Sequence, residues 1–294
     1  MTLDEILKRA NEEHWAVGHF NISNLEQLRA IMEAAKELRA PIMIGLSEGE
    51  RRAVGLKEAV ALIKAFHEEY GPTGGRAGLP VFLNPDHSHS AQSAKEAFDA
   101  GFDSVHVDLS KLPLEENIKG TKEVVDYVNR RQASVSIEGE LGYLRGESKI
   151  QKEKIVIKPE DLTNPEEAAD FVAKTGITRF AGAYGNSHGI SIDEPALDIE
   201  RIKAVRAALP ENVSMVLHGG SGIPDEQIKE AIAAGINNIH VNTEIRVAFT
   251  EALRKSLTEN PDETAPYKIT PQAIEAVKQK VEEKLKLFNS VNKI

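Results

Sequence analysis

The sequence predicts an α/β fold in which eight parallel strands close into a barrel. Apolar segments with strand character alternate with amphipathic helical segments along all 294 residues. This length suits such a barrel, which usually needs about 250 residues. No Gly-x-Gly-x-x-Gly turn follows the first predicted strand, which disfavours an open doubly wound sheet. We therefore predict a single (β/α)8 TIM-barrel domain over residues 1–294, with an N-terminal capping helix and a C-terminal helical extension.

Each predicted strand is a short, mostly apolar run, and most of these runs end beside polar residues. The eight ranges are Ala16–Asn21, Pro41–Leu46, Val81–Asn84, Ser104–Asp108, Ser134–Glu140, Arg179–Tyr184, Ser214–His218 and Asn238–Asn242. A helical pattern follows each of them. In Leu25–Leu38 the apolar residues recur at helical spacing, and Ser23 or Asn24 can cap the helix start.

Three segments lie outside this minimal pattern. An acidic helix, Thr2–His14, precedes the first strand, and we expect it to cover the bottom of the barrel. The segment Gly142–Asn164 is too long for a tight connection and suits a mobile lid. After the eighth strand, a helix over Arg246–Leu257 ends near Asn260-Pro261. A last helix, Pro271–Phe288, is available to pack on a neighbouring subunit.

Composition narrows the classes of function. The formal net charge of −10 argues against nucleic acid or an anionic membrane as a partner. Because the chain has no cysteine, any metal must be held by nitrogen and oxygen. The first residues lack the features of a secretory signal, and no apolar run approaches the roughly 18 residues of a membrane span. We expect a soluble, cytoplasmic protein.

Three histidines follow the predicted third, sixth and seventh strands. They are His87, His188 and His218. Because the carboxyl ends of barrel strands share one rim, the fold brings these imidazoles together. Three imidazoles with an open fourth position are typical of a catalytic zinc site. The remaining strand-associated histidines are predicted to be core or supporting groups, namely His19, His89, His106 and His240, whereas His14 and His67 are predicted to lie on the surface.

Glycines cluster beside two of these histidines. Gly189 follows His188, and Gly219-Gly220-Ser221-Gly222 follows His218 and leads into a helix start. The backbone N–H groups of such a turn bind anions, and a barrel's phosphate site usually lies after strands seven and eight. The side chains of Ser221, Asn242 and Thr243 can add donors there.

A metal beside a phosphate site suits proton abstraction next to a carbonyl group. Asp86 directly precedes His87 and can carry the proton. The residues alone thus suggest a phosphorylated ketose that is cleaved into two pieces.

These motifs resemble the class II, metal-dependent fructose-bisphosphate aldolase family, which includes the tagatose-bisphosphate aldolases. The matching stretches run across nearly the whole chain and are Gly18–Asn21, Asp86-His87, Val107–Ser110, Glu138–Gly142, Gly185–Gly189 and Leu217–Gly222. The resemblance implies an eight-stranded barrel that cleaves fructose 1,6-bisphosphate to dihydroxyacetone phosphate and glyceraldehyde 3-phosphate. It also implies a homodimer or homotetramer.

The resemblance further implies a role for each candidate residue. The Zn²⁺ ligands are His87, His188 and His218. The catalytic acid is Asp86. A second divalent ion matches Asp108 and Glu140. Substrate contacts match Asn21 and Ser47. The dihydroxyacetone phosphate site, which in the family also recruits a monovalent cation, matches Gly189, Gly219, Ser221, Asn242 and Thr243.

Three positions depart from the family pattern. His240 stands where an asparagine usually holds the enediolate, so its imidazole is expected to bind substrate with one hydrogen bond. The lid reads Arg145-Gly146-Glu147 in place of Gly-Gly-x-Glu-Asp, and Glu147 is the best candidate for the lid acid. An arginine that serves the far phosphate in many members is replaced near Pro266-Tyr267-Lys268. Either Lys268 or Arg145 compensates as a point charge, or the enzyme takes a monophosphate or an aldehyde without phosphate.

Several other functions stay open at this point. Tagatose bisphosphate differs from the fructose compound at one hydroxyl, and a sugar-phosphate epimerase uses a similar site. A metal-dependent hydrolase is suggested by His87-Ser88-His89, since alternate residues on a strand share a face. A barrel that binds metal or sugar phosphate without catalysis is the non-enzyme alternative.

Overall fold

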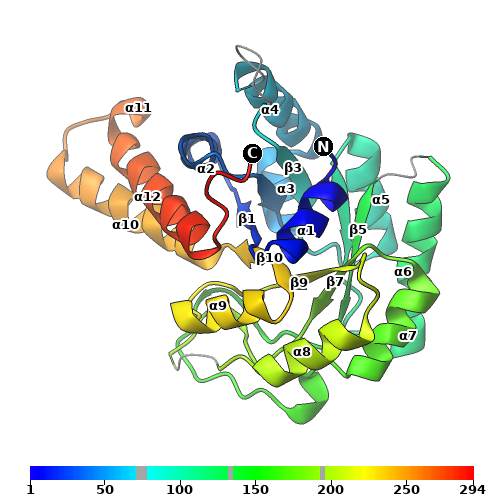
Figure 1. Cartoon of the computed structure of the whole chain (residues 1–294). Coiled ribbons are helices and arrows are strands. Elements are labelled where there is room, and N and C mark those ends of the chain that lie inside the picture. Colours follow the sequence, from blue (N-terminus) through cyan, green and yellow to red (C-terminus); the bar gives the residue numbers. More distant parts are fainter. Residues whose placement is uncertain (71–77, 132–134, 193–195) are drawn as a thin grey trace.

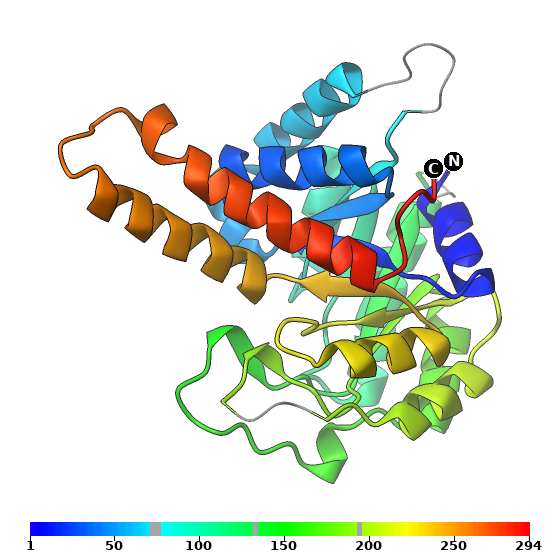
Figure 2. The ribbon, with the colours of Figure 1, turned by 60° about the vertical axis from the view of Figure 1, so that its left-hand side comes forward.

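The strands form a nearly closed barrel. The computed structural model describes residues 1–70, 78–131, 135–192 and 196–294. Eight parallel strands follow the order β3-β2-β1-β10-β9-β7-β5-β4, and a bridge between Ser88 and Val107 joins the two end strands. Helices surround this sheet in both views (Figures 1 and 2). The predicted fold class is confirmed.

All eight predicted strands are present with shifted ends. They are β1 Val17–Asn21, β2 Ile42–Leu46, β3 Val81–Pro85, β4 Ser104–Val107, β5 Ser136–Leu141, β7 Arg179–Gly182, β9 Ser214–Leu217 and β10 Ile236–Val241. The strand β7 ends before the predicted Tyr184 because the backbone N–H of Ala183 binds the Thr163 hydroxyl. The predicted start at Ser134 lies outside the described residues. Two short strands that we did not predict, β6 Gly146–Ile150 and β8 His188–Ile190, pair with each other.

The helices follow the strands in the expected alternation. They are α1 Leu3–Glu12, α2 Leu25–Leu38, α3 Glu48–Val54, α4 Leu56–Glu69, α5 Ala91–Ala100, α6 Leu114–Asn129, α7 Pro165–Thr175, α8 Ile199–Ala208, α9 Asp225–Ala233, α10 Thr243–Glu259, α11 Pro266–Ile269 and α12 Pro271–Leu287, with a 3-10 turn at Pro159–Asp161. In the described part of the chain, none of these helices is long and apolar enough to cross a bilayer.

The helix α1 covers the amino-terminal end of the barrel, as predicted. A capping box of Thr2 and Glu5 starts it. The side chain of Leu7 in this helix belongs to a buried apolar cluster with Trp15 and Val17. The backbone carbonyl of Leu7 accepts a hydrogen bond from the side chain of Asn237, near the start of β10. The predicted end at His14 is wrong by two residues. The chain leaves the helix after Glu12, and His14 takes a left-handed conformation at φ 52° that turns it toward β1.

The C-terminal extension is a helical hairpin that projects from the barrel. In both ribbon views α10 and α12 lie side by side, with α11 near the outer tip (Figures 1 and 2). The helix α12 also packs on α2. A buried ion pair, Lys284 Nζ to Glu244 Oε1 at 2.9 Å, joins α12 to the first turn of α10.

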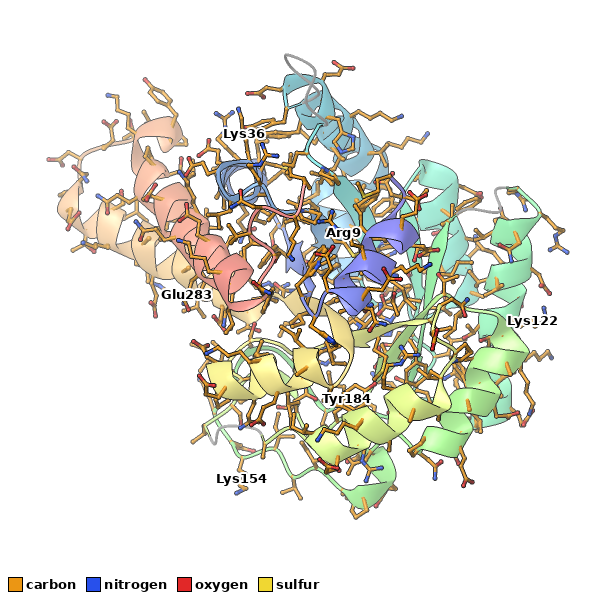
Figure 3. All side chains as sticks on the ribbon, in the orientation of Figure 1. Arg9, Lys36, Lys122, Lys154, Tyr184 and Glu283 are labelled. Carbon is orange, nitrogen blue, oxygen red and sulfur yellow. The ribbon has the colours of Figure 1, made fainter. Side chains whose placement is uncertain are left out.

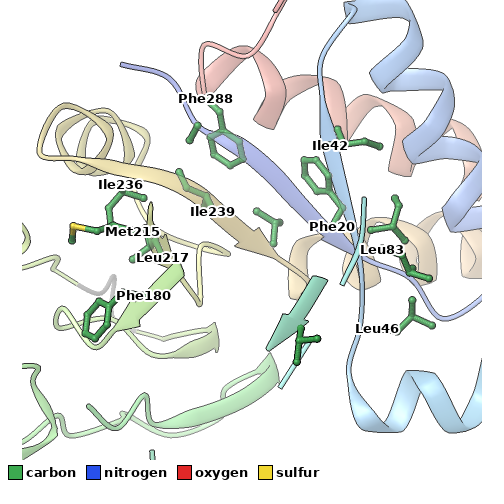
Figure 4. Packing of buried hydrophobic residues seen from close by; sticks show 14 of the residues in the cluster. Phe20, Ile42, Leu46, Leu83, Phe180, Met215, Leu217, Ile236, Ile239 and Phe288 are labelled. Atoms are coloured by element: carbon green, nitrogen blue, oxygen red, sulfur yellow. The ribbon is translucent and has the colours of Figure 1, made fainter. Parts of the chain in front are cut away.

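Apolar side chains fill the space between the strands and the helices. Phe20, Leu217 and Ile239 are fully buried there, and Figure 4 shows them packed with their neighbours. Charged side chains such as Lys122 and Glu283 point outward (Figure 3). Burial of this kind stabilises a fold by about 25 cal/mol per Å² of apolar surface removed from water.

The interior of the barrel is polar. Arg179 enters from the start of β7 and is fully buried. It forms an ion pair with Glu138 Oε2 at 2.8 Å and donates to Asn84 Oδ1 at 2.9 Å. A buried ion pair gives little net stability because both charges lose their hydration. The pair is better explained by the side chain that it holds in place. At the carboxyl-terminal end of the barrel, Glu138 also binds His218.

Replacing Asn24 with alanine should lower the free energy of unfolding by about 1 kcal/mol. Asn24, and not Ser23, caps α2, because its side-chain oxygen accepts from the Gln27 N–H at 2.9 Å. Urea denaturation measures the change. Ser23→Ala is the control and should cost clearly less; equal losses would contradict the assignment of the cap.

Candidate active site and metal centre

Three imidazoles meet at the carboxyl-terminal rim. His87 follows β3, His188 begins β8, and His218 follows β9. The Nε2 atoms of His87 and His188 are 3.2 Å apart, and one nitrogen of each of the three rings lies within 4.8 Å of the others. The structure thus brings the three predicted ligands together. His89 does not join them, because its Nδ1 is directed at Asp108, 3.2 Å away.

Two carboxylates orient these rings. Asp108 Oδ2 accepts from His87 Nδ1 at 2.8 Å, and Glu138 Oε1 accepts from His218 Nε2 at 2.7 Å. A ring that gives its N–H to a carboxylate keeps the lone pair on its other nitrogen. Metal-binding histidines are usually held in this way. The free nitrogens are then His87 Nε2 and His218 Nδ1.

The protonation of the rings depends on their neighbours. Burial and the adjacent His87 lower the pKa of His188 to about 3, so its lone pair is available at neutral pH. Burial alone would also lower the pKa of His87, but Asp86, Asp108 and Glu140 raise it well above its usual value. Without a metal, His87 therefore holds a second proton that a cation must displace.

Glu140 fits a second cation. It is buried, and its Oε2 has no hydrogen-bond partner among the described residues. Burial and the nearby Asp108 raise the pKa of Glu140 well above its ordinary value. Buried polar atoms normally have a partner, and an oxygen pair from Asp108 and Glu140 matches the oxygen ligands that hard divalent cations prefer.

His106 lies beneath the three rings and contacts the backbone of His87. Its Nδ1 accepts a hydrogen bond from the backbone N–H of His87 at 2.9 Å. Because burial lowers the pKa of His106 to about 3, the ring is neutral and its single hydrogen must sit on Nε2. That N–H faces Glu138 and Glu140 at 3.6 and 3.4 Å.

The backbone at His87 is strained. Its φ of 47° is left-handed, which is uncommon for a residue other than glycine. The buried Arg51 helps to hold this turn by donating to the His87 carbonyl at 3.3 Å and to the Ser88 hydroxyl at 3.1 Å. This role of Arg51 could not be predicted from the sequence, because a charged residue on a helix is usually exposed to solvent.

Asp86 is a buried carboxylate at the centre of the site. It accepts from Asn21 Nδ2 at 2.9 Å and from His240 Nδ1 at 3.1 Å. Burial would raise the pKa of Asp86, but His87 and the hydrogen bond from His240 hold it well below the ordinary value. Asp86 is therefore ionised and able to accept a proton.

The role expected of His240 changes in the structure. Burial and the stacked ring of His19, with centroids 3.5 Å apart, lower the pKa of His240 well below its usual value. The neutral ring donates its one hydrogen to Asp86, so its Nε2 carries a lone pair and not the donor expected for an enediolate. The two stacked rings lie in nearly parallel planes, so their lone pairs do not converge on one ion.

Two adjoining cavities contain the predicted substrate residues. The inner cavity, of about 20 Å³, has room for about one water molecule. Its lining includes Asn21, Asp86, His87, His188, Gly189, His218, Gly219, Ser221, His240, Asn242 and Thr243. The outer cavity, of about 380 Å³, is lined by residues that include Ser47, Asp108, Glu140 and Glu147.

The glycine turns have the geometry of an anion site. Gly189 and Gly219 have positive φ, and a Cβ on Gly219 would lie 2.5 Å from the Ser187 carbonyl oxygen, so the turn requires glycine. Ser221 Oγ accepts from the N–H of Glu244, and its hydroxyl hydrogen has no acceptor among the residues that the structure describes. The positive end of α10 begins at Thr243, beside the inner cavity.

Glu147, the predicted lid acid, does not reach the inner cavity in this structure. Glu147 lies in β6, its side chain is 75% exposed, and it pairs with Lys149 at 2.6 Å. The two cations expected to serve a far phosphate are also engaged elsewhere. Arg145 pairs with Asp161, Lys268 pairs with Glu263, and neither lines the two cavities.

Comparison with known proteins agrees with this geometry. Residues 1–293 match the family described as "Fructose-bisphosphate aldolase class-II". The chain belongs to this class II aldolase family. The aldolase is 38% identical to a fructose-bisphosphate aldolase of Geobacillus stearothermophilus over 294 residues, covering 100% of this chain and 98% of that one. It is also 38% identical to a probable fructose-bisphosphate aldolase of Bacillus subtilis (strain 168) over 293 residues, with 99% and 98% coverage.

A solved structure is similar over the same length. The YdjI aldolase from Escherichia coli K12 has a TM-score of 0.82 and 32% identity, covering 99% of this chain and 98% of that one. The chain is thus an enzyme, a metal-dependent carbon–carbon lyase of class II. The hydrolase and the non-catalytic barrel considered from the sequence are set aside.

The affinity of the metal-stripped aldolase for zinc should rise with pH. Because Asp86, Asp108 and Glu140 keep a proton on His87, zinc must displace it, and the dissociation constant should fall about tenfold per pH unit between pH 6 and 8 for each proton released. Competition with a chelator of known affinity measures this slope. Asp108→Asn removes one partner of that proton and should flatten the slope; a pH-independent affinity in the unchanged protein would contradict the assignment.

Proposed function

We propose that this aldolase cleaves fructose 1,6-bisphosphate to dihydroxyacetone phosphate and glyceraldehyde 3-phosphate, with zinc held by His87, His188 and His218. The observation that carries the proposal is the convergence of three imidazoles beside a glycine-rich anion turn. The names of the relatives from Geobacillus and Bacillus support this choice of substrate. A second divalent ion is proposed at Asp108 and Glu140.

Asp86 accepts the proton whose removal from the substrate starts cleavage. A divalent metal at the three histidines would supply positive charge next to the ketone oxygen of the substrate. Asp86 removes the proton of one hydroxyl group of the substrate. This hydroxyl is on the carbon that becomes the aldehyde, which is one of the two carbons of the bond that breaks. That oxygen then forms the aldehyde carbonyl, and the electron pair of the broken carbon–carbon bond stays with the ketone half. His240 and Asn21 hold Asp86 in place during this step.

The ketone half then needs a proton on carbon. We assign this step to Glu147 of the lid. The hydrogen bond from Lys149 lowers the pKa of Glu147, so Glu147 has to take up a proton from solvent before it gives one to the carbon. Its side chain points to Lys149 and lines only the outer cavity. The lid therefore has to move before Glu147 reaches the substrate, as lids do in many enzymes of this fold.

The phosphate of the ketone half is proposed to bind at the glycine turns. The backbone N–H groups around Gly189 and Gly219, the Ser221 hydroxyl and the start of α10 at Thr243 supply the donors. Asn242 lies at the same edge. A monovalent cation would offset the charge that two anions, the phosphate and Asp86, bring together.

The far phosphate is proposed to lie in the outer cavity. Two cations line this cavity, Arg52 and Lys111, and neither has a carboxylate partner among the described residues. Four acids line the same cavity. Glu48 lies near Arg51, Glu147 pairs with Lys149, and Asp108 accepts from His87. Burial and the nearby Asp108 raise the pKa of Glu140 well above its ordinary value, so this acid carries a proton when no metal is bound. The uncompensated charge is therefore positive and suits a phosphate or another anionic group, with Ser47 as a further donor.

We also propose that the aldolase works as a homodimer or homotetramer in the cytoplasm. The projecting α10–α12 hairpin supports an oligomer, because Tyr267 near its tip is 76% exposed and Leu257 is 47% exposed.

Replacing His188 with alanine should abolish both zinc retention and cleavage of fructose 1,6-bisphosphate. The substitution leaves two imidazoles, too few for a stable catalytic site. A coupled assay for dihydroxyacetone phosphate and metal analysis of the same sample measure the two effects. The unchanged protein should lose activity with a chelator and regain it with zinc. Normal turnover in His188→Ala would refute the proposal, as would turnover of tagatose 1,6-bisphosphate alone.

Replacing Arg52 with methionine should raise KM for fructose 1,6-bisphosphate by about tenfold. The same change should leave KM for fructose 1-phosphate, which has no far phosphate, nearly unchanged. Steady-state kinetics with both sugars measures the difference. Arg29→Met, a surface arginine away from both cavities, is the control. Equal effects on both sugars would contradict a far-phosphate role for Arg52.

A further inference from the structure

Glu50 is a buried carboxylate that the proposed reaction does not use. It lies in α3 and is only 4% exposed. Its oxygens accept from Ser47 N at 2.7 Å, Asn21 Nδ2 at 2.8 Å, Asn242 Nδ2 at 3.3 Å, Arg246 Nη2 at 2.5 Å and, more weakly, Ser23 Oγ at 3.5 Å. Three of these five partners, Asn21, Ser47 and Asn242, are residues that the sequence predicted to contact substrate.

The contacts of Glu50 fix two amide side chains. Asn21 Nδ2 lies between Glu50 and Asp86, at 2.8 and 2.9 Å. Because an ionised carboxylate only accepts hydrogen bonds, this atom must be the NH₂ group. Asn242 is oriented by Glu50 in the same way. The amide oxygens of both residues are then left buried without a hydrogen-bond partner among the described residues.

Arg246 connects this carboxylate to the lid. It extends from the first turns of α10, where Nη2 reaches Glu50 and Nη1 donates to the Ser148 carbonyl at 2.9 Å. Ser148 lies in β6 and lines both cavities. One guanidinium therefore holds the lid strand and the buried carboxylate at the same time.

The charge of Glu50 explains why this link affects substrate binding. A carboxylate next to Asn21 and Asn242 repels a phosphorylated ligand unless a cation cancels it. Arg246 is the one cation with a hydrogen bond to Glu50 in the described part of the chain. If the lid strand moved away, Arg246 would lose the Ser148 carbonyl, one of its two side-chain hydrogen-bond acceptors.

We propose that Arg246 is a positioning residue that fastens the lid strand β6 over the cavities and cancels the charge of Glu50, so that anionic substrate binds only when the strand is in place. This inference rests on the proposed function. Arginine suits the task because its planar guanidinium offers donors in two directions, whereas lysine concentrates its charge at one point.

The test compares Arg246→Met with Arg246→Lys in the full-length, zinc-loaded protein. For Arg246→Met we expect KM for fructose 1,6-bisphosphate to rise by about tenfold or more while kcat falls much less. Amide hydrogen exchange in peptides covering residues 144–151 should become faster, and zinc content should not change. Arg246→Lys should restore much of KM, since it keeps the charge, but the faster exchange should remain.

A double substitution separates the two effects. In Arg246→Met with Glu50→Gln no uncompensated carboxylate remains, so KM should rise less than in Arg246→Met alone, while exchange in the lid strand stays fast. Arg254→Met, an exposed arginine two turns further along α10, is the matched control and should leave both readouts unchanged.

Two results would overturn the proposal. One is unchanged lid exchange in Arg246→Met, and the other is a KM in the double variant as high as in the single one. Failure of the proposed function looks different, because the unchanged protein would then cleave no ketose phosphate. In that case exchange in residues 144–151, with and without inorganic phosphate, still decides whether Arg246 fastens the strand, and unchanged exchange in Arg246→Met again refutes it.

Discussion

The ionised carboxylate of Glu138 is the group on which the geometry of the rim depends. It is fully buried, with Arg179 at 2.8 Å on one oxygen and His218 at 2.7 Å on the other. Burial would raise the pKa of Glu138, but His106 and Arg179 hold it well below the ordinary value. Because Glu138 stays charged, it takes the N–H of His218 and leaves Nδ1 free for a metal. The buried Arg179 makes this charge tolerable inside the barrel.

The number of buried carboxylates near the three histidines explains why the site favours a cation. Four carboxylates, Asp86, Asp108, Glu138 and Glu140, are buried within it, and Arg179 neutralises only Glu138. Protons offset the rest when no metal is bound, on His87 and on Glu140, whose pKa values are both raised. A divalent ion held by these residues would supply the positive charge in place of those protons, and that charge would not be lost as pH rises. Metal binding at this site is therefore expected to release protons, so the affinity for the metal depends on pH.

The sequence predicted which residues meet at the rim, but not which atom of each residue faces the centre of the site. A histidine after a barrel strand must lie on the rim, so the meeting of His87, His188 and His218 follows from topology alone. Which nitrogen faces the centre depends on partners from other strands, and no local pattern contains that information. Arg179 starts a strand and looks like a surface charge. Glu50 completes a capping box with Ser47, which by itself explains a glutamate there. The pairing of β6 with β8 was missed because neither segment has strand-like alternation.

His240 stands where the family pattern has asparagine, and this difference changes the hydrogen bonds of the neighbouring residues. An asparagine there could donate from its amide toward the cavity, but the neutral imidazole gives its only hydrogen to Asp86. Asp86 is then held by two donors, and one of them, Asn21, shares its amide with Glu50. Glu50 in turn binds Arg246, which holds the Ser148 carbonyl of the lid. Ser148, Arg246, Glu50, Asn21 and Asp86 therefore form one unbroken chain of hydrogen bonds that leads from the lid strand to the buried carboxylate at the centre of the site.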